Sequence, residues 1–456
     1  MDDGVGEFGS RLRAWRTSSG LSQQELAEQS GLSVRAIGKL ECGQTRWPYP
    51  DSVGRLADAL DLRDAERAEF IAAAGRRLGP GTGPALPRAD HVYIPRLLPA
   101  PVPAFTGRAG ELQALTRMLG APGGTTLVTA VTGTAGAGKT ALAVHWAHQV
   151  AGAFPDGQLS VNLGGFGPSG SPLTPQDAVR VFLDALGVPA DRLPATAEAR
   201  LGLYRSLLAG KRMLILLDNA RDAAQVRPLL PGSPTCRVVV TSRDQLPGLT
   251  AIEAARPLTV NALTRAESRQ LLEGRLGSLR LAADRHATEQ IISSCAGLPL
   301  ALCIVAARAE LRPHLPLARI AADLAGQPGH PGHPGQLGQP GQPGQRSLDA
   351  LTDMTDPAAD IRASFSWSYR QLGGAAARTF RLAGLHPGAD LEPRAVAALT
   401  GMTAELAARA LDALARANLI QAVGQDRYTM NSLLRAYALE QAVWHDEHEN
   451  RAALTA

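Results

Sequence analysis

The chain contains 456 residues, of which 45% are hydrophobic and 19% charged, and its formal net charge is +4. This composition is that of a globular protein with room for two to four domains of ~100–200 residues, and it excludes a largely disordered chain. No apolar run approaches the ~20 residues of a membrane helix, and the acidic first ten residues lack a signal-peptide core. The four cysteines form no CxxC pair, which argues against zinc-finger and thioredoxin chemistry. We therefore expect a cytoplasmic protein with no membrane partner.

The first 78 residues are expected to form an all-helical domain. Ser22 and Glu25 have the spacing of a capping box, so a helix should begin directly after Ser22. Ser33 can cap a following helix that runs to about Cys42. Seven prolines between positions 79 and 103, with little hydrophobic periodicity, indicate a linker.

From about residue 104 onward, apolar β-type runs alternate with helical segments. Continuous apolar strands that alternate with helices predict an α/β fold with a parallel sheet, covered by helices on both faces. Thr264 and Glu267 form a second capping box at the start of a helical region. The expected strands are 125–131, 158–163, 213–217, 236–241 and 257–260.

A low-complexity Gly-Pro tract, which cannot bury a core, interrupts the chain before a last, mainly helical unit over 360–442 with two short β-type stretches. The chain shows no 34-residue repeat after this unit. The expected domains are a helix-turn-helix domain (1–78), a Pro-rich linker (79–103), a P-loop nucleotide-binding domain (104–262), a helical lid (263–325), a Gly-Pro loop (326–346), and a winged-helix domain with a C-terminal tail (347–456).

The segment 133–140, GTAGAGKT, matches G-x-x-x-x-G-K-[ST] at every fixed position, after an apolar strand and before a helix. Glycines let such a loop wrap an anion with its N–H groups, and the helix N-terminus favours negative charge. Lys139 would meet the β- and γ-phosphates of ATP, and Thr140 would bind Mg²⁺. The alternative is a Gly/Ala-rich turn, but only three of the 46 Lys and Arg residues are lysine, and one stands here.

Two further residues follow buried strands and are candidates for the same site. Asp218 ends an apolar strand and would orient the metal ion as the Walker B acid; the alternative is a helix cap. Asn219 occupies the place of a second acid, and because an amide cannot accept a proton from water, hydrolysis should be slow. Arg243 follows the next strand, where it could sense the γ-phosphate; the alternative is a solvated surface arginine.

These motifs, together with 105–108 (FTGR) and 297–301 (GLPLA), occur in the order and spacing of NB-ARC ATPases of the STAND class, and the resemblance covers about 104–442. It implies that 106–108 lies against adenine, that Pro299 packs on the nucleotide, and that a winged helix closes over the ADP-bound state. The segment 430–432 aligns with the family's Met-His-Asp motif, but here Asn431 replaces the histidine, which predicts a weaker ADP lock. The expected catalytic residues are Lys139, Asp218 and Arg243, with Thr140 and Asp218 on Mg²⁺, and the expected nucleotide-binding residues are Thr106, Gly107, Arg108, Gly133, Thr134, Ala135, Gly136, Ala137, Gly138, Lys139, Thr140, Ala141, Pro299 and Asn431.

Residues 8–62 resemble the helix-turn-helix of phage repressors, which inserts its third helix into the major groove. Helical spacing turns Ile37 and Leu40 toward the core. Residues 1–79 carry 11 basic and 12 acidic side chains, so a protein-binding module remains the alternative. The expected DNA-binding residues are Gln23, Ser33, Arg35, Ala36, Lys39 and Arg46.

The combination resembles bacterial STAND transcriptional regulators, including those related to antibiotic regulatory proteins. It implies a switch in which ADP keeps the ATPase module closed, while ATP opens it, promotes self-oligomerisation and clusters the DNA-binding domains. The alternative is an NLR-like defence or signalling switch that recruits a partner protein. In either case ATP, ADP and Mg²⁺ are the expected cofactors, and the chain is at most a slow ATPase.

Overall fold

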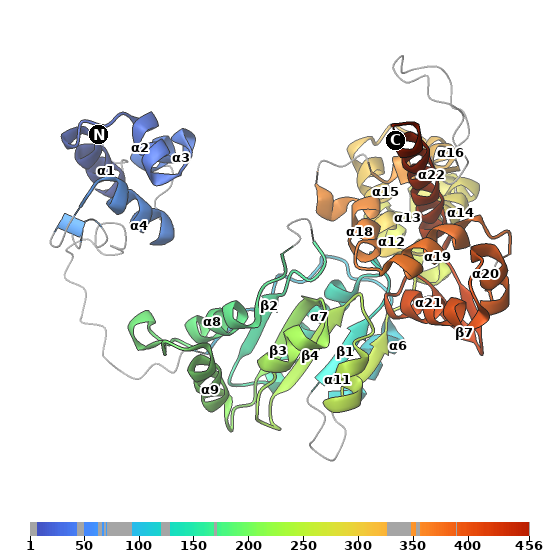
Figure 1. The fold of residues 1–456 in the computed structure, drawn as a ribbon, viewed down its shortest axis with the longest axis horizontal. Helices are drawn as coiled ribbons and strands as arrows, with labels where there is room; N and C mark the ends of the chain where they lie inside the picture. The colour runs from blue at the N-terminus through green and yellow to red at the C-terminus, as the bar shows by residue number, and fades with distance from the viewer. Residues whose placement is uncertain are drawn as a thin grey trace. The chain divides into compact units, whose positions relative to one another are not determined.

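The computed structural model describes residues 7–42, 50–62, 66–67, 70, 94–119, 128–167, 171–325, 348–352, 356–388 and 390–455. The chain divides into two compact units, Met1–His91 and Val92–Ala456 (Figure 1). Among the described residues, no helix is long and apolar enough to cross a membrane.

The first unit contains the helices α1 (Glu7–Ser18), α2 (Gln23–Ser30), α3 (Val34–Glu41) and α4 (Pro50–Ala59). The capping box of Ser22 and the Ser33 cap are both present, so the predicted starts of α2 and α3 are confirmed. Ile37 and Leu40 are buried, as their spacing indicated. A Cβ on Gly9 would lie 2.3 Å from the carbonyl oxygen of Leu40, so α1 and α3 cross at a contact that only glycine allows.

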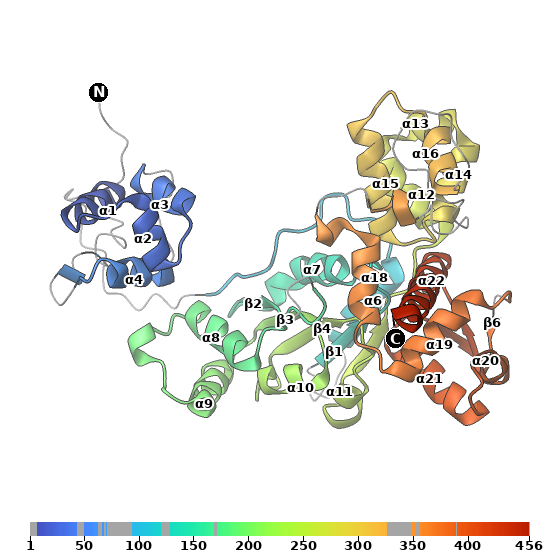
Figure 2. The ribbon, with the colours of Figure 1, turned by 45° about the horizontal axis from the view of Figure 1, so that its top comes forward.

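The second unit begins with a parallel sheet in the order β2-β3-β4-β1-β5, which confirms the predicted fold class. Successive residues of β3 and β4 are buried on opposite faces of the sheet, against α6 and α7 on one side and α8, α9, α10 and α11 on the other. Figure 2 shows α7 above the strands and α10 and α11 below them. The strands are β1 (Val128–Thr132), β2 (Gln158–Asn162), β3 (Leu214–Ala220), β4 (Arg237–Ser242) and β5 (Arg256–Thr259). The helices are α6 (Ala109–Leu119), α7 (Lys139–Val150), α8 (Pro175–Ala185), α9 (Ala197–Leu208), α10 (Ala223–Val226) and α11 (Pro247–Ile252), with short 3₁₀ turns η1 (Ala151–Ala153), η2 (Ala190–Arg192) and η3 (Arg227–Leu229).

A helical lid follows the sheet, and its first helix starts at the predicted capping box of Thr264 and Glu267. The lid comprises α12 (Arg265–Leu276), α13 (Ser278–Ala283), α14 (Arg285–Ser294), α15 (Pro299–Leu311) and α16 (Leu317–Ala325). The predicted Gly-Pro loop lies outside the described residues.

The last part of the chain has the helix-strand-helix-helix-strand-strand order of a winged helix, with a small antiparallel sheet in the order β6-β8-β7. The two-residue strand β6 was not foreseen, because two residues carry no alternation pattern. The elements are η4 (Pro357–Ala359), α18 (Ile361–Tyr369), α19 (Gly374–Leu385), β6 (Asp390–Leu391), α20 (Pro393–Thr400), α21 (Ala404–Arg416), β7 (Gln421–Gly424), β8 (Arg427–Thr429) and α22 (Ser432–Thr455).

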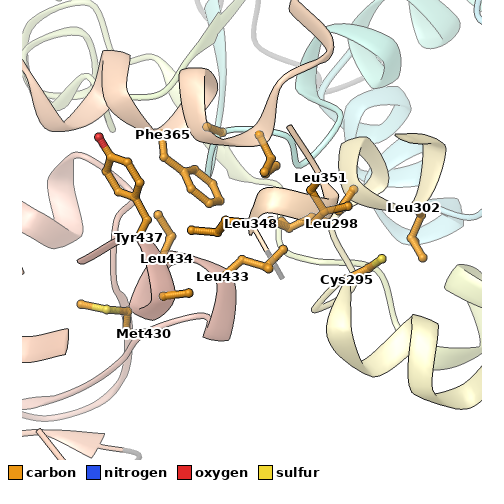
Figure 3. Close-up of a cluster of buried hydrophobic side chains, with 14 of the residues drawn as sticks. Cys295, Leu298, Leu302, Leu348, Leu351, Phe365, Met430, Leu433, Leu434 and Tyr437 are labelled. Carbon is orange, nitrogen blue, oxygen red and sulfur yellow. The ribbon is translucent and has the colours of Figure 1, made fainter. Parts of the chain in front are cut away.

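The lid and the winged helix share one hydrophobic core. In Figure 3, Leu298, Leu348 and Leu351 lie between Leu302 of the lid and Phe365 of α18, and Leu434 and Tyr437 of α22 lie beside Phe365. The buried Ala135 of the glycine-rich segment belongs to the same cluster. The packing of these two modules is therefore continuous with the loop between β1 and α7.

Candidate nucleotide site and candidate DNA interface

The segment between β1 and α7 forms a tight loop whose glycines are required by its backbone. Gly133 has φ of +149° and Gly138 has φ of +87°, values that other residues rarely adopt. A Cβ on Gly133 would also lie 2.3 Å from the carbonyl oxygen of Val260. Because α7 begins at Lys139, the N–H groups of its first turn lack intrahelical acceptors and face the loop. The predicted loop thus has the geometry of an anion cradle.

Lys139 is the first residue of α7, and only 9% of its surface is exposed. Its Nζ donates to the carbonyl oxygens of Gly133, at 2.8 Å, and Thr134, at 2.9 Å. The pKa of Lys139 is lowered to about 7, mainly by burial and also by the positive charge of Arg243, while Asp218 acts in the opposite direction. A phosphate beside Lys139 would supply the negative charge that this buried amine lacks.

Thr140 and Asp218 meet although they come from different elements. Thr140 Oγ1, in the first turn of α7 beside Ala141, donates to Asp218 Oδ1 at 2.7 Å. Thr241 Oγ1, near the end of β4, donates to the same oxygen at 2.6 Å. Within the described ranges, no group of three or more His, Cys, Asp or Glu side chains could hold a metal ion. One hydroxyl and one carboxylate nevertheless fit Mg²⁺, which keeps waters and takes its remaining ligands from phosphates.

Asn219 is directed away from this pair. It has φ of +58°, and its Nδ2 donates to the carbonyl oxygen of Phe166 at 3.0 Å. Its backbone N–H donates to Thr241 Oγ1, at 2.8 Å. Asn219 therefore positions the loop after β2 and the end of β4.

The segment before α6 contacts the loop, while the expected contact of residues 106–108 with adenine stays a prediction. The guanidinium of Arg108 donates to the carbonyl oxygen of Ala137 at 3.0 Å, and its backbone N–H donates to Glu267 Oε1 at 2.8 Å. A Cβ on Gly107 would lie 2.7 Å from Glu267, so glycine allows the approach to α12. Thr106 is half-buried and donates to the carbonyl oxygen of Ala104.

The start of α15 lies directly over the loop. The N–H of Leu300 donates to the carbonyl oxygen of Gly136 at 3.2 Å. Pro299 Cγ lies 3.5 Å from the position that a Cβ on Gly138 would take. The structure thus brings Pro299 to the candidate phosphate site.

The winged helix reaches the loop from the other side through a residue that the sequence did not indicate. Asn418, just after α21, accepts from Thr134 Oγ1 at 2.9 Å through its carbonyl oxygen. Asn431 accepts from the N–H of Leu433 and donates to the carbonyl oxygen of Ala296 at 3.3 Å. A cavity of about 420 Å³ lies among these elements and is lined by Gly133, Thr134, Asn261, Leu298, Asn418, Gln421, Met430 and Asn431, among others.

Arg243 is half-buried and packed against two aromatic rings, which argues against the alternative of a solvated surface arginine. Its Nη1 donates to the carbonyl oxygen of Ser364, and its guanidinium carbon lies 5.3 Å from the ring centroids of both Phe166 and Trp367. Burial lowers the pKa of Arg243 to about 10, and the nearby Asp218 opposes that shift. Contact with a γ-phosphate stays a prediction.

In the first unit, Gln23 is engaged by a buried carboxylate. Gln23 Nε2 donates to Glu41 Oε2 at 2.7 Å, and Arg16 Nε donates to Glu41 Oε1 at 2.6 Å. This network connects the start of α2 with the end of α3. A contact of Gln23 with DNA would use the part of its amide group that Glu41 leaves available.

The other candidate DNA-contacting residues belong to α3 or its flanks. Ser33 is exposed and caps the helix, Lys39 is exposed, and Ala36 is half-buried. Arg35 lies in α3, but its side chain is outside the described residues, as is the whole of Arg46.

Together these features define a helix-turn-helix domain combined with a parallel-sheet P-loop NTPase fold, a helical lid and a winged helix. A family model described as a helix-turn-helix domain matches residues 7–70. Over 457 aligned residues the chain is 35% identical to the regulatory protein AfsR of Streptomyces griseus, covering 94% of this chain and 44% of that protein. It is 38% identical to AfsR of Streptomyces coelicolor over 400 residues, which are 86% of this chain and 38% of that protein.

The chain therefore spans less than half the length of the curated relatives that it matches. Among solved structures, the Walker-type ATPase PABY2304 of Pyrococcus abyssi aligns with 74% of this chain and 96% of its own, at 13% identity and a TM-score of 0.47.

Proposed function

We propose that this protein is a nucleotide-gated transcriptional regulator of the STAND type, which binds DNA through its N-terminal helix-turn-helix. The observation that carries the proposal is the meeting of Lys139, Thr140 and Asp218 at a loop that both the lid and the winged helix contact. A ligand at this loop would alter the docking of both modules. The similarity to proteins named regulatory supports the same role.

Nucleotide binding at this site would use both side-chain charge and backbone N–H groups. Lys139 and the N–H groups of the first turn of α7 would hold the phosphates, while Arg108, Pro299 and Asn431 would contact the nucleotide from the surrounding elements. Thr140 and Asp218 would hold Mg²⁺, which neutralises phosphate charge when bound. We propose that this site works as the NB-ARC switch. ADP would favour the arrangement in which the winged helix is docked on the loop, and ATP would favour its release and self-oligomerisation in the cytoplasm.

Hydrolysis by this site should be slow. Asn219 cannot accept a proton from water, and its Nδ2 donates to the carbonyl oxygen of Phe166. A turnover far below the ~10 s⁻¹ of typical metabolic enzymes is what a switch needs, because the nucleotide must persist long enough to be sensed.

The proposal is tested by removing the phosphate-binding charge. Lys139→Ala should weaken ATP and ADP binding at least ~100-fold by calorimetry, since the charge-assisted hydrogen bonds to phosphate are lost. Lys211→Ala is the matched control, because Lys211 is a half-exposed lysine that pairs with Asp156 at 3.5 Å. Unchanged nucleotide affinity in Lys139→Ala would refute the nucleotide site.

A second function is favoured by the charge of the first unit. With 11 basic and 12 acidic side chains, residues 1–79 carry a net charge of −1, which does not by itself favour DNA. The alternative is a signalling switch whose N-terminal domain recruits a partner protein. A gel shift of the ATP-loaded oligomer with genomic fragments at low salt separates the two, since only the regulator retards DNA.

A further inference from the structure

The side chain of Arg243 is held between two aromatic rings that belong to separate parts of the chain. Phe166 lies in the loop after β2, and Trp367 lies on α18, and each ring centroid is 5.3 Å from the guanidinium carbon. Two ring faces stabilise a cation by their quadrupoles, most strongly where water is excluded. Arg243 is half-buried at this position.

The winged helix and the segment before it also hold Arg243 by hydrogen bonds. Its Nη1 donates to the carbonyl oxygen of Ser364 on α18, and its own carbonyl oxygen accepts from Asn418 Nδ2 at 2.8 Å. Asn418 in turn accepts from Thr134 of the phosphate loop. Both the side chain and the backbone of Arg243 are therefore bound to the C-terminal part of the chain.

Arg243 is also next to the candidate phosphate site. It directly follows β4, whose last residue Ser242 pairs with Thr132, the residue before Gly133. Its charge acts on Lys139, and the charge of Asp218 acts on it. Movement of the guanidinium toward a terminal phosphate would weaken the hydrogen bond of its Nη1 to Ser364 and its contacts with both rings.

We infer that Trp367 and Phe166 are positioning residues that hold Arg243 on α18 and thereby set the preference of the site between nucleoside di- and triphosphate. This inference rests on the proposed function. A diphosphate leaves Arg243 between the rings, whereas a triphosphate competes with the rings for the same guanidinium. The aromatic pair therefore weakens triphosphate binding selectively and couples that binding to release of α18.

The test measures the affinities of ADP and of a non-hydrolysable ATP analogue by calorimetry on the full chain. Trp367→Leu keeps an apolar side chain but removes the ring, so it should raise the affinity ratio of ATP analogue to ADP roughly five- to tenfold. ADP affinity should stay within about twofold. Trp367→Phe keeps a ring face and should restore a ratio close to that of the wild type.

Two controls separate positioning from general loosening of the fold. Trp444→Leu removes a half-exposed tryptophan of α22 and should leave the ratio unchanged. In an Arg243→Gln background, Trp367→Leu should have no effect on the ratio, because no guanidinium remains to be held. Phe166→Leu removes the other ring from a different element and should act like Trp367→Leu, which keeps the test open if one variant does not fold.

The outcomes distinguish this inference from the proposal beneath it. A wild-type chain that binds neither nucleotide would overturn both. A wild-type chain that binds both nucleotides, with ratios unchanged in Trp367→Leu and Phe166→Leu, would overturn only the positioning role. A ratio change that persists in the Arg243→Gln background would also overturn it.

Discussion

At the scale of single residues, the most informative polar group of the first unit is Glu41. Its side chain is 3% exposed and receives hydrogen bonds from Arg16 and Gln23. Burial alone would raise the pKa of Glu41, but the hydrogen bonds from Arg16 and Gln23 and the positive charge of Arg16 outweigh burial and lower it. A lowered carboxyl pKa means that the folded unit is stabilised where Glu41 is ionised.

This stabilisation should depend on pH in a defined direction. It is fully present above the ~4.3 pKa of an unfolded glutamate and is lost as the pH falls through the lower pKa of the folded state. We expect amide protection in α1–α3 of the full chain to fall below pH ~4, and Glu41→Gln to reduce protection at neutral pH and flatten this dependence. Glu28→Gln, at an exposed position of α2, is the control. Equal pH profiles for Glu41→Gln and the wild type would contradict the prediction.

Asn431 is a second residue whose identity should affect nucleotide binding. It lines the cavity next to Gly133 and Thr134, and it caps the start of α22. In the family that the sequence resembles, a histidine at this position donates to the ADP β-phosphate. A hydrogen bond from a neutral amide contributes ~0.5–1.5 kcal/mol of net stabilisation, whereas a hydrogen bond that involves a charged group contributes ~1.5–3 kcal/mol.

Asn431→His should therefore tighten ADP binding by ~1 kcal/mol, about fivefold, and shift the protein toward the monomer. Isothermal calorimetry with ADP and the elution volume in the presence of ATP measure the two effects. If both stay unchanged, Asn431 does not occupy the locking position, and the alignment of residues 428–432 is wrong.

At the scale of elements, α3 carries the candidate DNA contacts. Its inner residues Ile37 and Leu40 are buried, and the Arg16–Glu41 pair ties its C-terminal end to α1. The outer side carries Ser33 and Lys39, both exposed. A helix fixed on one side and polar on the other suits the major groove.

Two substitutions in α3 should have different signatures in DNA binding. Arg35→Ala should weaken binding to the specific site by ~1–3 kcal/mol if the arginine makes a bidentate hydrogen bond to a base. If Lys39 contacts a phosphate, Lys39→Ala should weaken binding to all DNA sequences. It should also reduce the slope of log affinity against log salt concentration by about one. Arg13→Ala, an exposed position of α1, should leave the sequence preference unchanged. Identical salt slopes for Lys39→Ala and the wild type would exclude the phosphate contact.

At the scale of the whole molecule, the candidate nucleotide site is a junction between modules. The glycine-rich loop contacts Arg108 before α6, Leu300 at the start of the lid, and Asn418 of the winged helix. The lid and the winged helix share one core that also includes Ala135 of the loop. A ligand can shift the docking equilibrium only by its difference in affinity for the two arrangements.

ATP should therefore change the assembly state of the full chain, whereas ADP should not. We expect light scattering after size exclusion to show a larger mass with ATP and Mg²⁺ than with ADP, and Lys139→Ala to show the same mass with either nucleotide. DNA retardation should increase with the larger species, because linked binding domains raise the effective concentration. A single mass under all conditions would refute oligomerisation as the readout.

The amino-acid sequence by itself determined those features that depend on neighbouring residues. The capping boxes at Ser22 and Thr264, the alternation of apolar strands with helices, and the loop at 133–140 are local patterns, and the structure confirms each. Helix caps and strand periodicity act over a few residues, so composition and spacing are sufficient to predict them. All six expected DNA contacts, from Gln23 to Arg46, stay predictions.

Only the tertiary structure decided which distant side chains meet. In the sheet β4 lies between β1 and β3, and both Thr241 and Thr140 donate hydrogen bonds to Asp218. It also brought Ser364 to Arg243 across 121 positions and Asn418 to Thr134 across 284. An asparagine after a helix and a tryptophan on an amphipathic helix have ordinary local explanations, a cap and a core contact. Their role at the loop arises only when long-range packing places the modules together, and such packing leaves no periodic signal in the chain.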